Sequence, residues 1–171
     1  IHKKKINLCL NLADYYSAEC KRDYILAQTY NKNLSFLPLM PNAGGFNLEK
    51  VKKLRNKYKV NDRNIIIIKG YVSKFGQADI VLEAIIKMED LLKDYKIIFY
   101  SASNFIKRKI TSLKKYSKLN ISFTKKISHN EMLNLFSKSK IYIGISRSDG
   151  LSTSFLEAIT LGVFPIQSST S

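Results

Sequence analysis

Four isoleucines in succession, at positions 65–68, constrain the fold of this chain more than any other feature of its sequence. β-Branched residues favour extended backbone, and a short apolar run without polar interruption is typical of a strand that is buried on both faces. Such strands belong to parallel sheets, because these sheets are covered by helices on each side. We therefore expect residues 64–69 to form an inner strand of a parallel sheet.

Strand and helix patterns alternate through the rest of the chain. From residue 77 to 95, apolar side chains recur at 81, 85, 88, 92 and 95, which is helical spacing. Further strands are predicted at 96–101, 121–124, 141–146 and 164–167, and further helices at 104–119, 128–139 and 152–161. Five strands interleaved with four helices predict a doubly wound, Rossmann-like α/β domain with right-handed crossovers and ligands at the carboxyl ends of the strands.

The two ends of the chain have a different organisation. Residues 13–39 are predicted to form a strand, a helix and a second strand, and the stretch Pro-Asn-Ala-Gly-Gly at 41–45 has the composition of a linker. The last residues are serine-rich where a strand would lead into another helix. We expect a piece of a longer protein, with the end of one domain at 1–40, a linker and a helix at 41–63, and an incomplete second domain at 64–171.

The net charge is strongly positive, at +16, with 29 Lys and Arg against 13 Asp and Glu. A field of that size attracts polyanions, among them nucleic acid, anionic lipid headgroups and phosphorylated small molecules. Most of the excess is lysine on expected solvent faces, and lysine suits a hydrated surface better than bidentate phosphate recognition. We interpret the charge as a lysine-rich surface with some membrane affinity, and a basic nucleic-acid-binding module is the alternative.

Cysteine, histidine and apolar runs exclude several classes of protein. Two cysteines and two histidines are too few for a disulfide framework or a zinc site. No apolar run has the length of a membrane span, and the first residues lack the apolar core of a signal peptide. We expect a cytoplasmic protein with reduced thiols.

Two of the predicted strand-to-helix loops carry distinctive residues. In the first, Gly70 and Gly76 flank Lys74 directly after the isoleucine strand, which ends at Lys69. Backbone N–H groups and a cation at such a junction can hold phosphate. The spacing matches neither G-x-G-x-x-G nor the Walker motif, so ordinary turn chemistry is the favoured alternative for this loop taken alone.

The second loop lies in SRSDGLSTSFLEA, residues 146–158. Asp149 follows a buried strand, Gly150 permits close approach of the backbone, and Glu157 falls in the first turns of the next helix. Ser154 and Glu157 also have the spacing of a capping box, and Ser152 or Thr153 could be an ordinary N-cap. Capping explains the hydroxyl groups and the glutamate, but not the polar residues crowded at the strand end.

Residues 146–168 resemble the signature of retaining GT-B glycosyltransferases of the family 4 type. In both, two acidic residues have seven residues between them, and Glu-Ala, a glycine and a strand with proline follow. The first acidic residue is usually Glu in that family and is Asp149 here. Residues 121–143 resemble the strand, loop and helix before the signature, and 41–45 resemble the interdomain linker. The resemblance implies a donor-binding domain at 64–171 and the end of the acceptor domain at 1–40.

The resemblance also implies roles for individual residues. Glu157 would hold the ribose hydroxyls of a nucleotide by accepting two hydrogen bonds, and Asp149 would contact hydroxyls of the transferred sugar. Backbone N–H groups at the start of the following helix would face the diphosphate, where negative charge grows during transfer. They belong to the loop Gly150, Leu151, Ser152 and Thr153.

The remaining donor contacts of the family come from two other loops. The family has an Arg and a Lys in its first strand-to-helix loop; Lys74 is the best lysine candidate here and Lys69 the second. Tyr71 or Gln77 stands where the arginine is expected, which is a departure from the family pattern. A separate pair, Lys126 and Ile127, lies where the family packs the nucleobase.

The implied activity is transfer of a hexosyl group from a nucleotide-diphosphate sugar, of UDP or GDP, to a polysaccharide or lipid-linked glycan, with retention of configuration. Such an enzyme needs no metal or other cofactor and no covalent intermediate, so we name no nucleophile. His129 is interpreted as a capping or surface residue rather than a base.

The same resemblance implies partners. It fits capsule or lipopolysaccharide synthesis, peripheral contact with an anionic inner leaflet, and no nucleic acid partner. An incomplete donor half is expected to bind a nucleotide sugar weakly and to transfer nothing. A nucleotide-sugar epimerase of the same fold is the other enzymatic alternative.

Overall fold

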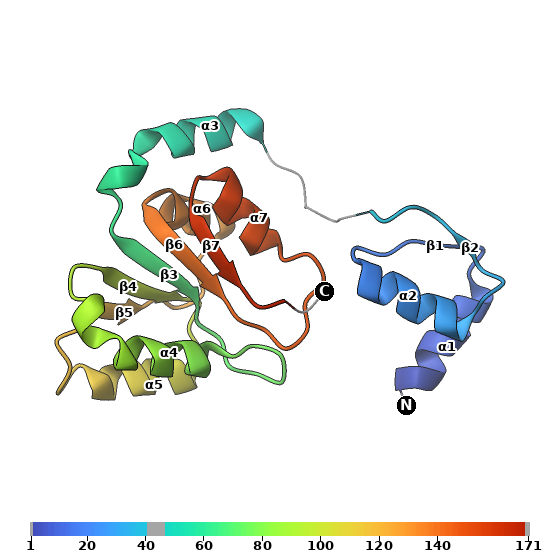
Figure 1. Cartoon of the computed structure of the whole chain (residues 1–171), viewed down its shortest axis with the longest axis horizontal. Coiled ribbons are helices and arrows are strands. Elements are labelled where there is room, and N and C mark those ends of the chain that lie inside the picture. Colours follow the sequence, from blue (N-terminus) through green and yellow to red (C-terminus); the bar gives the residue numbers. More distant parts are fainter. Residues whose placement is uncertain (1, 41–46, 170–171) are drawn as a thin grey trace. The chain divides into compact units, whose positions relative to one another are not determined.

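Residues 2–40 and 47–169 are described by the structure, a computed structural model (Figure 1). They form two compact units. The smaller contains residues 2–40 and the loop segment Ser148–Thr153; the larger contains residues 47–147 and Ser154–Ser169. Each unit is described by itself below. The predicted linker at 41–45 lies outside the described residues.

The larger unit is built on a parallel sheet of five strands, in the order β5-β4-β3-β6-β7. The strands are β3 (Ile65–Lys69), β4 (Lys96–Tyr100), β5 (Ile121–Phe123), β6 (Ser139–Gly144) and β7 (Phe164–Gln167). The chain moves outward from β3 to β5 and then returns to the other side of β3. This doubly wound α/β fold confirms the prediction, and its topological switch point lies between β3 and β6.

Helices cover the sheet on both faces (Figure 1). On one face lie α4 (Ala78–Lys87) and α5 (Asn104–Leu113), and on the other lie α3 (Leu48–Lys57), α6 (His129–Ser137) and α7 (Thr153–Thr160). Three of these helices begin after a side chain that accepts a hydrogen bond from the first turn, which is ordinary N-capping. The capping residues are Asn47, Ser103 and Ser128.

The isoleucine run supplies both cores. Ile66 and Ile68 pack in the core beneath α4 and α5, whereas Ile67 packs in the core beneath α3, α6 and α7. All three are at most 3% exposed. Successive side chains of a strand point to opposite faces, so a strand covered on both faces needs an apolar residue at every position. This explains the absence of alternation in the sequence.

Several element boundaries differ from the prediction. The helix expected over 77–95 ends at Lys87, and a short 3-10 turn, Glu89–Leu91, follows. Leu92 and Tyr95 still pack against the core beneath α4 and α5, so their helical spacing reflects burial from a turn. Likewise α5 ends at Leu113 rather than at 119, and β6 begins at Ser139 and ends at Gly144 rather than spanning 141–146.

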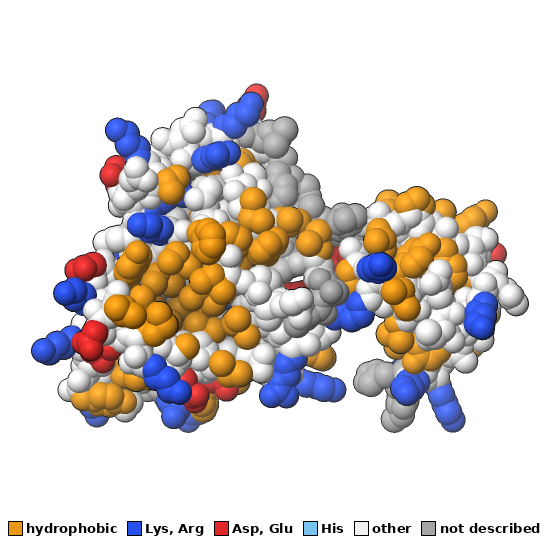
Figure 2. Space-filling model, viewed as in Figure 1, with side chains coloured by type: hydrophobic (Ala, Val, Ile, Leu, Met, Phe, Trp, Pro, Cys, Tyr) orange, Lys and Arg blue, Asp and Glu red, His pale blue; other side chains and the backbone are white. Residues whose placement is uncertain are grey.

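Apolar side chains also gather on one surface of this unit (Figure 2). Helices α4 and α5 cover β3, β4 and β5 on that face, and isoleucines of β6 and β7 lie beside α4. These isoleucines and apolar side chains of α4 line a groove of about 320 Å³. Its walls include Ile80, Ala84 and Met88 of α4 and Ile141, Ile143 and Ile166 of the strands.

The smaller unit contains α1 (His2–Leu12), β1 (Tyr15–Tyr16), α2 (Lys21–Tyr30) and β2 (Ser35–Phe36), with β1 and β2 parallel. The predicted strand, helix and strand are present, and α1 was not predicted. The apolar residues of α1 alternate with polar ones, and of these Leu10 is buried while Leu8 and Leu12 are exposed. Because the apolar residues of α1 alternate with polar ones and few of them are buried, the sequence does not show the spacing that indicates a helix.

Within the described residues, none of the helices combines the length and the apolar character that crossing a membrane requires.

Candidate functional site

The two distinctive loops of the larger unit lie side by side at the switch point. Residues 70–77 follow β3, and residues 145–147 follow β6. Backbone bonds join them: the N–H of Gln77 donates to the carbonyl of Ile145 (3.2 Å), and the N–H of Arg147 donates to the carbonyl of Phe75 (2.8 Å). At such a point the segments that follow neighbouring strands lead to opposite faces of the sheet, and α/β proteins bind ligands in the crevice that this leaves.

The two glycines of the first loop allow close packing. A Cβ atom at Gly76 would lie 2.2 Å from the ring of Tyr71, and one at Gly70 would lie 2.9 Å from the Cα atom of Ala102. Neither position can hold a larger residue without movement of its neighbours. These contacts agree with the turn interpretation of the two glycines, and their role in donor binding stays a prediction.

Backbone N–H groups of this loop are partly engaged within the loop. The hydroxyl of Ser73 accepts from the N–H groups of Phe75 (3.1 Å) and Gly76 (3.0 Å), so these two donors are satisfied without a ligand. Lys74 is exposed and Lys69 is half-buried. The ammonium of Lys74 lies 5.7 Å from the centroid of the Phe75 ring, and that of Lys69 lies 5.1 Å from the centroid of the Tyr71 ring. Any phosphate contact made here would therefore come mainly from lysine.

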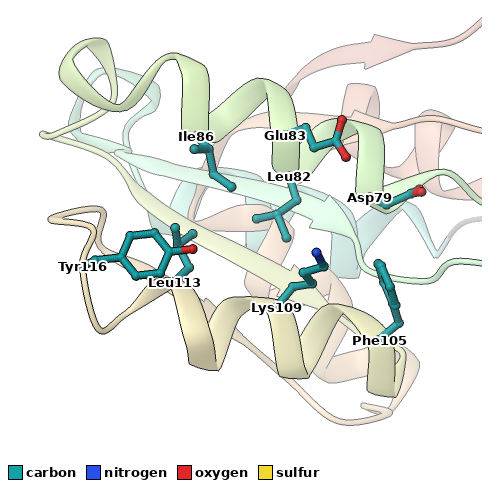
Figure 3. Close-up of a pocket in the computed structure, with 8 residues that line it drawn as sticks. All are labelled: Asp79, Leu82, Glu83, Ile86, Phe105, Lys109, Leu113 and Tyr116. Atoms are coloured by element: carbon teal, nitrogen blue, oxygen red, sulfur yellow. The ribbon is translucent and has the colours of Figure 1, made fainter.

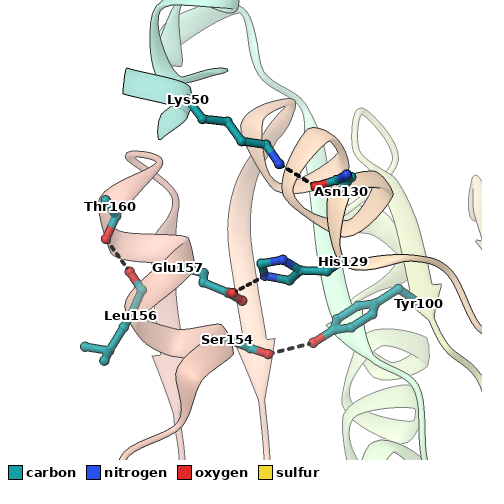
Figure 4. Close-up of polar contacts among 8 residues, drawn as sticks. All are labelled: Lys50, Tyr100, His129, Asn130, Ser154, Leu156, Glu157 and Thr160. Atoms are coloured by element: carbon teal, nitrogen blue, oxygen red, sulfur yellow. Dashed lines mark hydrogen bonds and ion pairs between the residues drawn. The ribbon is translucent and has the colours of Figure 1, made fainter. Parts of the chain in front are cut away.

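Glu157 is the buried charge on this side of the sheet. It lies in α7, is 3% exposed, and its Oε1 atom lies 2.5 Å from Nε2 of His129 (Figure 4). His129 is the first residue of α6, directly after the N-cap Ser128. The predicted ribose-binding carboxylate thus lies beside the start of α6, with a histidine of that helix on one of its oxygens.

The capping-box interpretation of Ser154 and Glu157 is wrong. Because α7 begins at Thr153, Ser154 lies inside the helix, and its hydroxyl accepts from the hydroxyl of Tyr100 at 3.4 Å (Figure 4). Burial raises the pKa of Tyr100 well above its usual value, so this hydroxyl keeps its proton and donates. A capping box is present instead at the start of α6.

That capping box joins Ser128 and Glu131. The Ser128 hydroxyl accepts from the backbone N–H of Glu131, and the Glu131 carboxylate accepts from the backbone N–H of Ser128 at 2.8 Å. Hydrogen bonds from the side chain and then the backbone of Ser128 lower the pKa of Glu131. His129 stands between these two residues, so the cap orients the turn from which its ring projects.

Two further polar atoms are buried at the carboxyl ends of β6 and β7. The Ser146 hydroxyl and the Oε1 atom of Gln167 have no hydrogen-bond partner among the described residues. Buried polar atoms in proteins are nearly always hydrogen-bonded, so these two are available to a polar molecule at this edge. The sequence patterns contain no signal for either atom.

The remaining predicted residues lie in two loops. Asp149, Gly150, Leu151 and Ser152 connect β6 to α7, which begins at Thr153. Segment Ser148–Thr153 groups with the smaller unit and Glu157 with the larger, so the pairing of Asp149 with Glu157 stays a prediction. Lys126 and Ile127 connect β5 to α6; Ile127 packs against the core beneath α3, α6 and α7, and Lys126 is exposed.

Sequence reasoning missed the contact between His129 and Glu157. The two residues are 28 positions apart on different helices, and no spacing rule relates them. The prediction that His129 is a capping or surface residue is correct in that its side chain is largely exposed, but Ser128 provides the cap. The position of His129 directly after a residue that can cap a helix was the one sequence feature that could have drawn attention to it.

A groove of about 150 Å³ lies elsewhere, between α4 and α5 (Figure 3). Leu82 and Leu113 form part of its floor, and charged side chains stand at its rim; these are Asp79, Glu83 and Lys109. None of its lining residues was predicted to bind a ligand.

Among the residues that the structure describes, no three His, Cys, Asp or Glu side chains are grouped as metal ligands.

Comparison with protein families gives one match. The model of the family described as "Glycosyl transferases group 1" matches residues 50–171. That range includes the whole five-stranded sheet and every residue predicted to bind the donor. Among curated proteins, none matches the chain by sequence.

Solved structures share the fold at low sequence identity. The pneumococcal O-GlcNAc transferase GtfA, solved with UDP and GlcNAc, has a TM-score of 0.71 and 14% identity over 99% of this chain and 33% of its own. A GtfA/B complex gives 0.67 and 13% over 96% and 32%. WaaG, a glycosyltransferase involved in lipopolysaccharide biosynthesis, gives 0.57 and 15% over 88% and 43%. The chain thus spans about a third of the first two proteins.

Proposed function

Because the chain belongs to the glycosyl transferases group 1 family, we propose that it is the donor-binding part of an enzyme that transfers a sugar from a nucleotide-diphosphate sugar to a glycan or lipid-linked acceptor. We further propose that transfer proceeds with retention of configuration and that the sugar is a hexose.

The observation that carries the proposal is the buried carboxylate of Glu157, which lies beside the start of α6. Such a group is costly to bury, and the one side-chain hydrogen bond that the described residues give it, from a largely exposed histidine, leaves it with unused acceptor capacity. Two neighbouring hydroxyls of a ribose ring would supply donors for it. The match of residues 50–171 to the family supports the same role, since the signature containing Glu157 lies inside that range.

The rest of the donor is assigned by resemblance. Asp149 would accept from hydroxyls of the transferred sugar, and the N–H groups of Leu151, Ser152 and Thr153 would face the diphosphate at the start of α7. Lys69 and Lys74 would add positive charge, with Lys74 the better candidate. Together these groups would stabilise the negative charge that develops on the leaving diphosphate, and we propose that they do so without a metal ion.

Acceptor and location are proposed from the charge and the family. A net charge of +16 would attract the chain to an anionic membrane surface, where lipid-linked acceptors are held. We propose a cytoplasmic protein, peripheral to the inner face of the membrane, that serves surface polysaccharide or lipopolysaccharide synthesis and does not act on nucleic acid. The chain alone would bind the donor without completing transfer.

Thermal shift of the full chain at physiological salt tests the proposal. UDP or GDP should raise the midpoint of unfolding, and Glu157→Ala should abolish that rise. Asn130→Ala is the matched control, because Asn130 lies beside His129 on α6 but contacts Lys50 rather than Glu157 (Figure 4).

Two outcomes would refute the proposal. Oligonucleotides that stabilise the chain at physiological salt, where UDP and GDP do not, would favour the nucleic-acid-binding alternative. A nucleotide effect that survives in Glu157→Ala would show that this carboxylate is structural.

A further inference from the structure

We infer that His129 is a positioning residue for nucleotide binding: its ring holds the buried carboxylate of Glu157 so that the second carboxylate oxygen is directed at the ribose hydroxyls. The inference rests on the proposed function, and it assigns a role that neither the family signature nor the sequence patterns contain. His129 itself is not proposed to contact the sugar or the reacting atoms.

The two side chains of this contact differ greatly in their exposure to solvent. The side chain of Glu157 is 4% exposed, whereas that of His129 is 63% exposed, and their Oε1 and Nε2 atoms are 2.5 Å apart. A ring that is mostly in solvent reaches a carboxylate that is almost wholly buried. The carboxylate therefore lies directly beneath the surface, and His129 stands at the boundary between it and water.

The carboxylate of Glu157 can accept more hydrogen bonds than the one it receives from His129. A carboxylate can accept about four hydrogen bonds, and among the described residues His129 is the one side chain that hydrogen-bonds to Glu157. That bond occupies Oε1. Fixing one oxygen removes rotation of the carboxylate plane, so the ligand binds a group that is already oriented and the cost of ordering it is not incurred on binding.

The N-terminus of α6, where His129 lies, is fixed by hydrogen bonds. The capping box between Ser128 and Glu131 holds the backbone on both sides of His129. The neighbouring Asn130 takes no part in this cap, and its exposed side chain accepts a hydrogen bond from the ammonium of Lys50 on α3 (Figure 4). The turn from which the His129 ring projects is therefore held by its own cap.

A neutralising role is the competing explanation. A carboxylate with no partner is costly to bury, and an imidazole beside it offsets part of that cost. Both roles predict that loss of His129 lowers stability. Only the positioning role predicts that its loss changes how well the protein distinguishes a ribose from a deoxyribose, because only that role acts through the second oxygen of Glu157.

Titration calorimetry of the full chain with UDP and with 2′-deoxy-UDP separates the two roles; GDP and its 2′-deoxy form are used if the chain binds GDP. The wild-type chain should bind the ribonucleotide more tightly. In His129→Ala, affinity for the ribonucleotide should fall about tenfold, the size of one hydrogen bond to a charged group, while the deoxy form changes little. The preference for ribose should therefore nearly disappear.

Two variants complete the design. His129→Gln keeps a donor within reach of Glu157 and should retain most of the preference, and Asn130→Ala should retain all of it. Since the His129 side chain is largely exposed, its truncation leaves both cores intact. If the alanine variant nonetheless fails to fold, His129→Leu, which has no donor, takes its place.

The possible failures are distinguishable. If the wild-type chain binds neither nucleotide, the proposed function fails and this inference falls with it. If nucleotides bind and Glu157→Gln weakens them, but His129→Ala keeps the full preference for ribose, then the proposed function stands and the positioning role is refuted.

Discussion

Two charged side chains are buried to the same extent in the larger unit, and they are held in different ways. Arg63 and Glu157 are each 3% exposed. Arg63 lies directly before β3, at the amino end of the sheet, and donates to backbone carbonyls of Arg55 (3.2 Å), Tyr58 (2.9 Å) and Leu161 (2.9 Å). Glu157 lies in the middle of α7, and among the described residues one exposed side chain, that of His129, hydrogen-bonds to its carboxylate.

The difference in partners distinguishes a charge whose hydrogen bonds are satisfied within the fold from one that keeps hydrogen-bonding capacity. Backbone carbonyls at the ends of α3 and α7 cannot leave Arg63 without unfolding of the helix ends, so its donors are permanently satisfied. Burial lowers the pKa of Arg63 from its usual value, although a guanidinium keeps its charge under ordinary conditions. The partner of Glu157 is a side chain at the surface, and the carboxylate retains acceptor capacity for a ligand.

Replacing Arg63 should give the largest loss of stability. Arg63→Met keeps an apolar side chain of similar length and removes every donor to the three carbonyls, so the free energy of unfolding should fall by about 3 kcal/mol. Urea unfolding followed by tyrosine fluorescence would measure this loss. Nucleotide binding by the folded protein should be unchanged.

The control for that experiment is Arg55→Ala. Arg55 has an exposed side chain on α3, and its carbonyl, which the substitution retains, is the part that contacts Arg63. Its replacement should change stability by no more than about 0.5 kcal/mol. If Arg63→Met changed the free energy of unfolding as little as Arg55→Ala does, the bonds of Arg63 to backbone carbonyls would not stabilise the fold, and the contrast with Glu157 would fail.

Replacing Glu157 should affect binding far more than stability. Glu157→Gln keeps the shape and an acceptor for His129, so the free energy of unfolding should fall by at most about 1 kcal/mol. The same urea titration measures it beside Arg63→Met. A loss as large as that of Arg63→Met would mean that Glu157 is a structural residue, and the contrast between the two charges would fail.

The fold was predictable where burial is recorded locally. The isoleucine run indicates a strand covered on both faces, and the structure places Ile66 and Ile68 in one core and Ile67 in the other. The end of α4 was not predictable, since Leu92 and Tyr95 reach the core from outside the helix at helical spacing. Helix α1 was missed because its apolar residues alternate.

The candidate site was predictable only in part. A signature within one loop and helix indicates Glu157, because the residues that define it are adjacent in sequence. The contact with His129 depends on how α6 and α7 pack together, which no local pattern records. The same holds for Ser154, whose spacing from Glu157 suggested a capping box, whereas its hydroxyl is engaged by Tyr100 on a strand.

The smallest expected effect concerns the cap that holds His129. Ser128→Ala removes the side-chain acceptor at the start of α6, and loss of an N-cap lowers the free energy of unfolding by about 1 kcal/mol. Because His129 follows the cap directly, its ring should become less ordered, and the preference for ribose over deoxyribose should weaken without disappearing. Titration calorimetry with the two nucleotides measures this. Unchanged preference would show that the cap does not act through His129.

Acid should reduce the contribution of this cap. The pKa of Glu131 is lowered in the folded protein by its bonds with Ser128, so its contribution to stability is present above the unfolded pKa and is lost as the pH falls through the folded value. In Ser128→Ala the bond from the Ser128 hydroxyl is missing. The difference in stability between the wild-type chain and this variant should therefore narrow as the pH falls below the range in which Glu131 is ionised. Urea titrations of both proteins across that range measure the narrowing, and a difference independent of pH would mean that Glu131 takes no part in fixing the turn that carries His129.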